Sequence, residues 1–265
     1  MLAMRRTTVS ISGAAGRMGQ RLCALAGEVD GIELVEAFER PGHDSIGKPA
    51  SPDSPILIAD TYTGRGDVLI DFTTPDTTPA LLDACVKLKK AMVIGTTGLD
   101  GEDDEAIDDA ADHIPILFAP NMSLGVNILF SIAAQVARQL GEGFDIEILE
   151  AHHRHKKDAP SGTALGLADS ICRATGKDAG DLIYTRYGAE EPRVPGKITI
   201  QSLRLGDVVG EHTVFFGGPG EQLELKHVAT SRDTFARGAL KAALWLHAPG
   251  RKPGRYSMND VLGLG

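Results

Sequence analysis

The stretch Thr8-Val-Ser-Ile-Ser-Gly13-Ala-Ala-Gly16-Arg-Met-Gly19 joins a short β-branched run to a glycine-rich turn. A helical pattern follows from Arg17 to Ala26, and Gly27 is placed to end that helix. A strand, a glycine-rich turn and a helix in this order favour a dinucleotide-binding unit, because small residues let the backbone approach a pyrophosphate. The Gly-x-x-Gly-x-x-Gly spacing is a relaxed form of the common motif, so a plain tight turn is the alternative.

Strand-like and helix-like segments alternate over roughly residues 1–120. Strand-like segments lie at Ile32–Phe38, Val68–Phe72, Ala91–Gly95 and Ile114–Phe118, and the continuous apolar run Val68–Phe72 is typical of a strand buried on both faces. Helical patterns lie at Thr77–Lys89 and from Glu102 onward, where Glu102–Glu105 suit the positive end of the helix dipole. The alternation predicts an α/β fold with a Rossmann-like, doubly wound parallel sheet.

A different pattern begins after residue 124 and predicts an α+β second domain with a mixed or antiparallel sheet. We expect helices at Val126–Leu140 and Ser161–Thr175, a strand at Asp145–Glu150, and antiparallel strands at Ile198–Arg204, Glu211–Phe216 and Gln222–Val228. An alanine-rich helix at Thr234–Leu246 could pack back on the first domain. The expected division is therefore residues 1–124 with 234–265 for dinucleotide binding, and residues 125–233 for substrate binding.

Composition and charge narrow the class of protein. The 265 residues, 42% hydrophobic and 24% charged, are ordinary for a globular chain of one or two domains. A formal net charge of −9 disfavours nucleic acids and anionic membranes as partners, because the long-range field repels phosphate. No apolar stretch approaches the ~20 residues of a membrane span.

The cysteines and the N-terminal residues indicate a compartment. Cys23, Cys85 and Cys172 are far apart and form no Cys-x-x-Cys pair, which suggests reduced thiols. The first residues lack the apolar run of a signal peptide. We therefore expect a cytoplasmic protein in which Cys23 and Cys172, within apolar helical patterns, are buried.

Three further segments lie where the first domain would hold a nucleotide. Glu39 follows the second strand about 20 residues after the glycines, where a carboxylate accepts ribose hydroxyls, and Arg40 could pair with a 2′-phosphate. Both residues together make NADH and NADPH plausible cofactors, and a solvated strand end is the alternative. Gly95-Thr-Thr-Gly98 and Ala119-Pro-Asn-Met122 follow later strands, where small residues would leave room for a nicotinamide, although ordinary loops are equally compatible.

The segment Glu150-Ala-His-His-Arg-His-Lys-Lys-Asp-Ala-Pro-Ser-Gly-Thr163 places three imidazoles and three cationic side chains within His152–Lys157. A solvated charged loop is one interpretation. A metal site is another, but Lys156 and Lys157 would repel a cation, so we expect no metal. We favour an anion site with acid catalysis: the cations hold carboxylates, a histidine donates a proton, and the helix start at Ser161–Thr163 offers backbone N–H groups.

This segment resembles, without a gap, the signature of the 4-hydroxy-tetrahydrodipicolinate reductase family, also called dihydrodipicolinate reductases, of the bacterial lysine pathway. Most of the chain shares the resemblance. Further matching segments, in family order, are Gly13–Gly19, Asp71-Phe-Thr, Gly95–Gly98, Arg204-Leu-Gly-Asp-Val-Val-Gly-Glu-His212 and Ser231-Arg-Asp-Thr-Phe235.

The resemblance implies a role for each matching residue. It implies pyrophosphate binding by Gly13, Ala14, Ala15, Gly16, Arg17 and Met18, ribose binding by Glu39, and 2′-phosphate binding by Arg40. It implies that Gly95, Thr96, Thr97, Ala119, Pro120, Asn121 and Met122 line the nicotinamide side. His152 is implied as the proton donor, Lys156 as the second catalytic residue, and His153, Gly162 and Thr163 as ligands of the substrate carboxylates. Lys157 matches no conserved role.

The resemblance also implies the reaction and the assembly. The reaction is reduction of 4-hydroxy-tetrahydrodipicolinate, a small dicarboxylate, to tetrahydrodipicolinate with NADH or NADPH. The assembly is a homotetramer formed through the second domain's sheet, with the first domain completed by the C-terminal segment. Two alternatives stay open: another NAD(P)-dependent dehydrogenase of an amino-acid pathway, and a nucleotide-binding regulator without turnover.

Overall fold

The computed structural model describes residues 6–52, 54–186, 188 and 192–264. The chain forms two compact units: Met1–Leu124 with Arg232–Gly265 (unit 1), and Gly125–Ser231 (unit 2). The return to unit 1 lies two residues before the boundary expected at 233. Arg232 occupies the N-cap position of the helix Asp233–Leu246, whose buried side chains belong to the unit 1 core.

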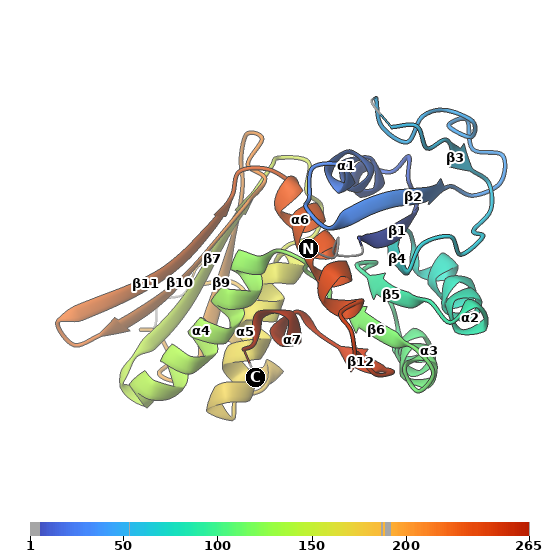
Figure 1. The fold of residues 1–265 in the computed structure, drawn as a ribbon. Helices are drawn as coiled ribbons and strands as arrows, with labels where there is room; N and C mark the ends of the chain where they lie inside the picture. The colour runs from blue at the N-terminus through green and yellow to red at the C-terminus, as the bar shows by residue number, and fades with distance from the viewer. Residues whose placement is uncertain (1–5, 53, 187, 189–191, 265) are drawn as a thin grey trace. The chain divides into compact units, whose positions relative to one another are not determined.

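Unit 1 is built on a parallel sheet (Figure 1). Its strands are β1 (Thr7–Ser12), β2 (Ile32–Phe38), β3 (Ile58–Ala59), β4 (Val68–Asp71), β5 (Ala91–Ile94), β6 (Pro115–Phe118) and β12 (Gly254–Tyr256). They lie in the order β12-β6-β5-β4-β1-β2-β3, and every neighbouring pair is parallel. The predicted Rossmann-like sheet is confirmed, and the C-terminal strand β12 extends it.

Helices cover both faces of this sheet. They are α1 (Arg17–Ala26), α2 (Thr78–Leu88), α3 (Gly101–Ala111), α6 (Asp233–Leu246) and α7 (Met258–Leu262), with a 3₁₀ turn at Pro75–Thr77. Helices α1 and α6 share one core with Ile11 and Val93, whereas α2 and α3 share the other with Met92 and Ile94. Successive strand residues point to opposite faces, so the apolar runs read from the sequence fill both cores.

Unit 2 is built on a mixed sheet whose strands are β7 (Asp145–His152), β8 (Leu182–Ile183), β9 (Ile198–Arg204), β10 (Gly210–Gly218) and β11 (Glu221–Ala229). The order is β11-β10-β7-β9-β8. The expectation of antiparallel pairing throughout Ile198–Val228 is wrong for β9, which runs parallel to β7 and β8. The helix α5 (Gly162–Thr175) supplies the crossover connection that a parallel pair requires.

One face of the unit 2 sheet is covered by α4 (Leu124–Leu140) and α5, as Figure 1 shows. Their side chains share a core with the strand residues Ile148, Ile200 and Phe216. Short 3₁₀ turns lie at Gly141–Gly143 and Ala179–Asp181. Cys23 and Cys172 are buried as expected, and so is Cys85. Among the described residues, no helix is both long and apolar enough to cross a membrane.

Candidate active site

The face of the unit 2 sheet beneath the helices changes from apolar to polar at one end. Along β7 the inward residues Ile146 and Ile148 are followed by Glu150 and His152, and all four are buried. His212 on β10 pairs in register with Glu150. Because alternate strand residues share a face, this register gathers carboxylate and imidazole groups under the start of α5.

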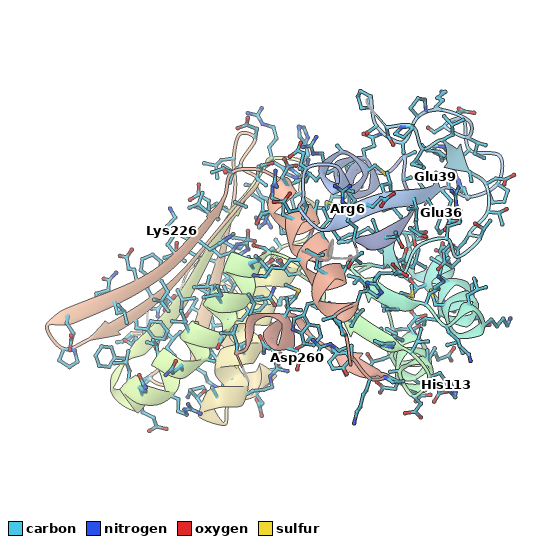
Figure 2. The ribbon with its side chains drawn as sticks, in the orientation of Figure 1. Arg6, Glu36, Glu39, His113, Lys226 and Asp260 are labelled. Carbon is cyan, nitrogen blue, oxygen red and sulfur yellow. The ribbon has the colours of Figure 1, made fainter. Side chains whose placement is uncertain are left out.

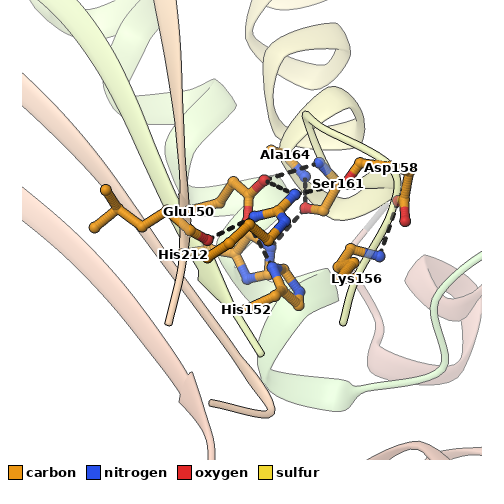
Figure 3. A network of polar contacts seen from close by, with 9 residues as sticks. Glu150, His152, Lys156, Asp158, Ser161, Ala164 and His212 are labelled. Carbon is orange, nitrogen blue, oxygen red and sulfur yellow. Dashed lines mark hydrogen bonds and ion pairs between the residues drawn. The ribbon is translucent and has the colours of Figure 1, made fainter. Parts of the chain in front are cut away.

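Glu150 is the centre of this polar group and is fully buried (Figure 3). Its Oε2 lies 2.5 Å from His152 Nδ1, and its Oε1 accepts the backbone N–H of Ser161 at 3.1 Å. Arg204 on β9 donates to both oxygens, at 2.8 and 2.9 Å. Burial acts to raise the pKa of Glu150, but hydrogen bonds from His152 and Arg204 outweigh it and hold that pKa well below its usual range.

His212 is a second buried imidazole in the group. Its Nε2 lies 3.1 Å from Ser161 Oγ, and its ring meets the His152 ring edge-on, with centroids 5.2 Å apart. Burial, together with repulsion from His152, lowers the pKa of His212 to about 3, so this imidazole is neutral at physiological pH. Its Nδ1 is buried and has no hydrogen-bond partner within the described part of the chain.

The start of α5 is fixed by the same residues. Ser161 is the N-cap of the helix, and its Oγ accepts the N–H of Ala164 at 3.2 Å. Gly162 and Thr163 form the first turn of α5. The backbone N–H groups of a first helical turn have no acceptor within their own helix. The positive end of the α5 helix dipole therefore lies close to His152, and this position suits a carboxylate ligand.

The loop between β7 and α5 carries the predicted second catalytic cation. Lys156 is partly buried, and its Nζ forms an ion pair with Asp158 Oδ2 at 2.8 Å (Figure 3). Lys157 is exposed. His153 is half-buried, with its ring centroid 6.3 Å from that of His155. Lys156 therefore has an anionic partner that the sequence interpretation did not include.

In unit 1 the glycine-rich turn packs so closely on neighbouring residues that it leaves no room for side chains at two of its glycines. Gly13 has φ +66°, and a Cβ there would lie 2.9 Å from Thr73 Cγ2. A Cβ at Gly19 would lie 2.0 Å from the Gly13 carbonyl oxygen, so only glycine lets α1 start this close to β1. Within the described chain, no side chain caps the N-terminus of α1 at Gly16. The first N–H groups of α1 can therefore receive a phosphate.

Two carboxylates lie along β2, as Figure 2 shows. Glu36 is buried and accepts the hydroxyl of Ser10 at 2.6 Å, so it is engaged inside the fold. Glu39 follows the strand and is only half-buried. Its Oε1 accepts the N–H of Ala15 at 2.9 Å, which brings the predicted ribose ligand onto the glycine-rich turn. Arg40 is exposed beside it.

A buried carboxyl group organises the predicted nicotinamide side. Asp71, at the end of β4, accepts hydroxyl hydrogen bonds from Thr73, Thr78 and Thr96 at 2.7, 2.9 and 3.0 Å. Burial raises its pKa, while these hydroxyls act in the opposite direction. Asp71 thereby fixes the loops after β4 and β5 against each other. In the neighbouring segment Ala119 and Met122 are buried, Asn121 is half-buried, and Pro120 and Thr97 are exposed.

The structure thus gathers the predicted residues in two places. His152, Lys156 and the start of α5 lie together in unit 2, whereas the glycine-rich turn and Glu39 lie together in unit 1. Sequence reasoning assigned no role to five of the residues that hold these groups: Asp71, Glu150, Asp158, Arg204 and His212. One signal was present for Glu150, because the alternation of β7 places it in the inward register with His152, where an unpaired charge is costly.

Two family models match the chain. The model for the N-terminus of dihydrodipicolinate reductase matches residues 7–122, and the model for its C-terminus matches residues 125–262. The 4-hydroxy-tetrahydrodipicolinate reductase of Alkalilimnicola ehrlichii is 48% identical over 97% of this chain and 99% of its own length. The enzyme of the same name from Thiobacillus denitrificans is 46% identical over 97% and 98%.

Solved structures show the same likeness. Dipicolinate-bound dihydrodipicolinate reductase from Paenisporosarcina sp. TG-14 superposes with a TM-score of 0.76 at 25% identity, over 95% of this chain and 97% of that chain. A myo-inositol dehydrogenase from Corynebacterium glutamicum shares the fold at 14% identity, with a TM-score of 0.61 over 98% and 93%.

Proposed function

The chain belongs to the dihydrodipicolinate reductase family, and from that premise we propose how its own residues reduce 4-hydroxy-tetrahydrodipicolinate to tetrahydrodipicolinate. The protein is an oxidoreductase of lysine and diaminopimelate biosynthesis. The observation that carries the residue assignment is the buried contact of His152 Nδ1 with Glu150, which leaves the Nε2 of the same ring for proton transfer.

The glycine-rich turn of unit 1 fits a dinucleotide. The positive φ of Gly13 and the uncapped start of α1 leave backbone N–H groups for a pyrophosphate. Glu39 would accept ribose hydroxyls, and exposed Arg40 would attract a 2′-phosphate, so both NADH and NADPH are proposed cofactors. Gly95–Thr97 and Ala119–Met122 would flank the nicotinamide. When bound, the reduced nicotinamide supplies the hydride that the reaction requires.

The unit 2 group fits the substrate, a small dianion. The N–H groups at the start of α5, with Gly162 and Thr163, would bind one carboxylate, and His153 would contribute to holding the acid groups. A relative's structure contains dipicolinate, a flat diacid, which supports a dicarboxylate ligand here. Lys156 would add positive charge, and substrate carboxylates would compete with Asp158 for that cation.

Loss of water from the 4-hydroxy substrate leaves an α,β-unsaturated cyclic imine. Conjugate addition of hydride to this imine develops negative charge on the ring nitrogen, and this charge must be stabilised or protonated. His152 Nε2 is proposed as the proton donor, since a positioned histidine is an effective general acid near neutral pH. A methyl group at position 210 would lie 3.1 Å from this nitrogen, so Gly210 keeps space beside it. Lys156 would stabilise the developing charge electrostatically.

The open face of the unit 2 sheet supports a homotetramer. Leu203 on β9 and Val228 on β11 are each 46% exposed on this sheet, and strand β11 is an edge. Exposed apolar side chains on an uncovered sheet are typical of an interface between subunits. Sedimentation analysis should give the mass of four chains, and a monomer at micromolar concentration would contradict this assembly.

The activity is tested by following nicotinamide absorbance with freshly generated 4-hydroxy-tetrahydrodipicolinate and each cofactor in turn. We expect loss of the reduced cofactor that requires both enzyme and substrate, with tetrahydrodipicolinate as product. Oxidation of NADH or NADPH in the presence of other imino or keto acids, but not in the presence of this substrate, would identify a different dehydrogenase. Cofactor binding without oxidation of NADH or NADPH would identify a regulator.

A further inference from the structure

We propose that Glu150 is a positioning residue that holds the proton donor His152 and the carboxylate-binding start of α5 in one fixed arrangement. The inference rests on the proposed function, because it presumes that His152 donates the proton. It concerns a residue that touches neither substrate nor cofactor. Its carboxylate joins His152 Nδ1 to the N–H of Ser161, two groups that lie nine residues apart in the chain.

The Glu150 carboxylate is already saturated with donors. Oε2 receives donors from His152 and Arg204, Oε1 receives donors from Ser161 and Arg204, and the Ser202 side chain donates to the carboxylate as well. A carboxylate has about four lone-pair sites, so none is left for a ligand. The side chain is also 0% exposed, which excludes contact with solvent or substrate. Glu150 can therefore act only through the groups that it holds.

The carboxylate determines which nitrogen of His152 exchanges a proton. An ionised carboxylate only accepts hydrogen bonds, so the nitrogen 2.5 Å away, Nδ1, must carry a hydrogen. Nε2 is then the nitrogen that gains and loses the catalytic proton. The orientation and the tautomer of the donor thus follow from one neighbour.

The same carboxylate also fixes the start of α5, where a substrate carboxylate is proposed to bind. Ser161 donates its N–H to Glu150 Oε1, and its hydroxyl both caps α5 and contacts His212. Movement of the donor relative to the helix start would break at least one of these buried bonds. Because misplacement of reacting groups by about 1 Å can cost about 10²-fold in rate, a shared rigid support for both groups has a direct catalytic effect.

Arg204 keeps the Glu150 carboxylate ionised. It lies opposite His152 in the parallel β7–β9 register, and both of its terminal nitrogens bind Glu150. Its Nη2 also donates to the Asp158 carbonyl at 2.5 Å, which ties the Lys156 loop to the same point. The charged or titratable groups that surround the Glu150–His152 pair are Arg204 on β9, His212 on β10, His227 on β11, and Lys156 and Asp158 in the loop.

The test compares Glu150→Gln and Glu150→Asp with Glu147→Gln as the matched control. Glu147 lies on the same strand but in the outward register, where it pairs with Arg193. For Glu150→Gln we expect kcat to fall on the order of 10–10³-fold, with the KM for NADH unchanged. Glu150→Asp should recover part of the rate, and Glu147→Gln should behave as wild type.

A measurement on the wild type removes dependence on variant folding. Nitrogen-15 NMR of labelled histidine, assigned by the signal lost in His152→Gln, reports the neutral tautomer at high pH. Hydrogen on Nδ1 is expected, and hydrogen on Nε2 would overturn the proposal. An active wild type whose Glu150→Gln variant kept the full kcat would overturn it too. An inactive wild type, or a fully active His152→Gln variant, would instead overturn the proposed function.

Discussion

The carboxylate of Glu39 accepts the backbone N–H of Ala15 at 2.9 Å. This bond joins the end of β2 to the glycine-rich turn, across 24 positions in the sequence. The residue proposed to bind ribose therefore also shapes the loop proposed to bind pyrophosphate. One side chain can in this way couple two parts of the cofactor site.

Replacement of Glu39 by alanine should weaken NADH binding more than NADPH binding. The carboxylate would accept ribose hydroxyls of NADH but repel the 2′-phosphate of NADPH, which Arg40 attracts. Loss of one charged hydrogen bond corresponds to about 1.5–3 kcal/mol for NADH. Calorimetric titration with each cofactor measures the difference. Glu33→Ala, an exposed position on the same strand, is the control. Equal losses for both cofactors would count against the ribose assignment.

Lys156→Met should impair both turnover and substrate binding. A cation beside a dianion and a developing negative charge acts on the ground state and the transition state alike. Lys157→Met is the matched control and should be nearly silent, since Lys157 is exposed and has no proposed role. Steady-state kinetics of both variants separates kcat from KM. Greater sensitivity at Lys157 would show that the roles along this loop are assigned to the wrong residues.

His212 should make folding stability depend on pH. Burial lowers the pKa of His212 to about 3 in the folded state, whereas an unfolded histidine titrates near 6.5. Between these values the unfolded chain binds a proton that the folded chain does not. Stability should therefore fall as the pH drops below about 6.5, by at most about 1.4 kcal/mol per pH unit for one such group.

The measurement is urea unfolding between pH 5 and pH 7. His212→Gln should show a smaller loss of stability across this range than wild type, because glutamine does not titrate. The pKa of His227 is also lowered by burial, so the stability of the variant should still depend on pH to a smaller extent. Identical pH dependence in wild type and variant would mean that His212 is not held neutral.

Much of the fold was predictable from local pattern. The buried runs at β4 and β5 read as strands because parallel strands are buried on both faces, and Gly176 ends α5 in the left-handed conformation. Two kinds of feature were not predictable. The two-residue strand β3 is too short to show a period, and the pattern of β9 carries no information about strand direction.

The candidate site also contains residues that could be predicted from the sequence and residues that could not. His152 and Lys156 stand out because their residue types cluster within one loop. Their direct partners Glu150 and Asp158 lie only two positions away, whereas Arg204 lies 54 positions from Glu150, and His212 lies 51 from Ser161. Only the folded structure brings these distant partners together. Sequence reasoning could therefore propose which groups react, but not which groups orient them.

A flat aromatic diacid, pyridine-2,6-dicarboxylate, should bind as an unreactive substrate mimic. A ligand at about 100 times its Kd stabilises the folded state by roughly 2.7 kcal/mol, which appears as a higher melting temperature. We expect a larger rise with NADH present, because the reaction requires both ligands to be held together. His153→Ala and Thr163→Val should reduce the rise. An unchanged melting temperature in wild type and in its NADH complex would argue against a dicarboxylate site.

The most direct measurement is the steady-state rate of NADH oxidation by His152→Gln with freshly generated substrate. A positioned general acid contributes typically about 10²–10⁴-fold, so kcat should fall within that range while KM changes far less. Unchanged melting temperature and NADH affinity in the variant would exclude misfolding as the cause. Full activity in His152→Gln would remove His152 from the mechanism and contradict the proposed proton donor.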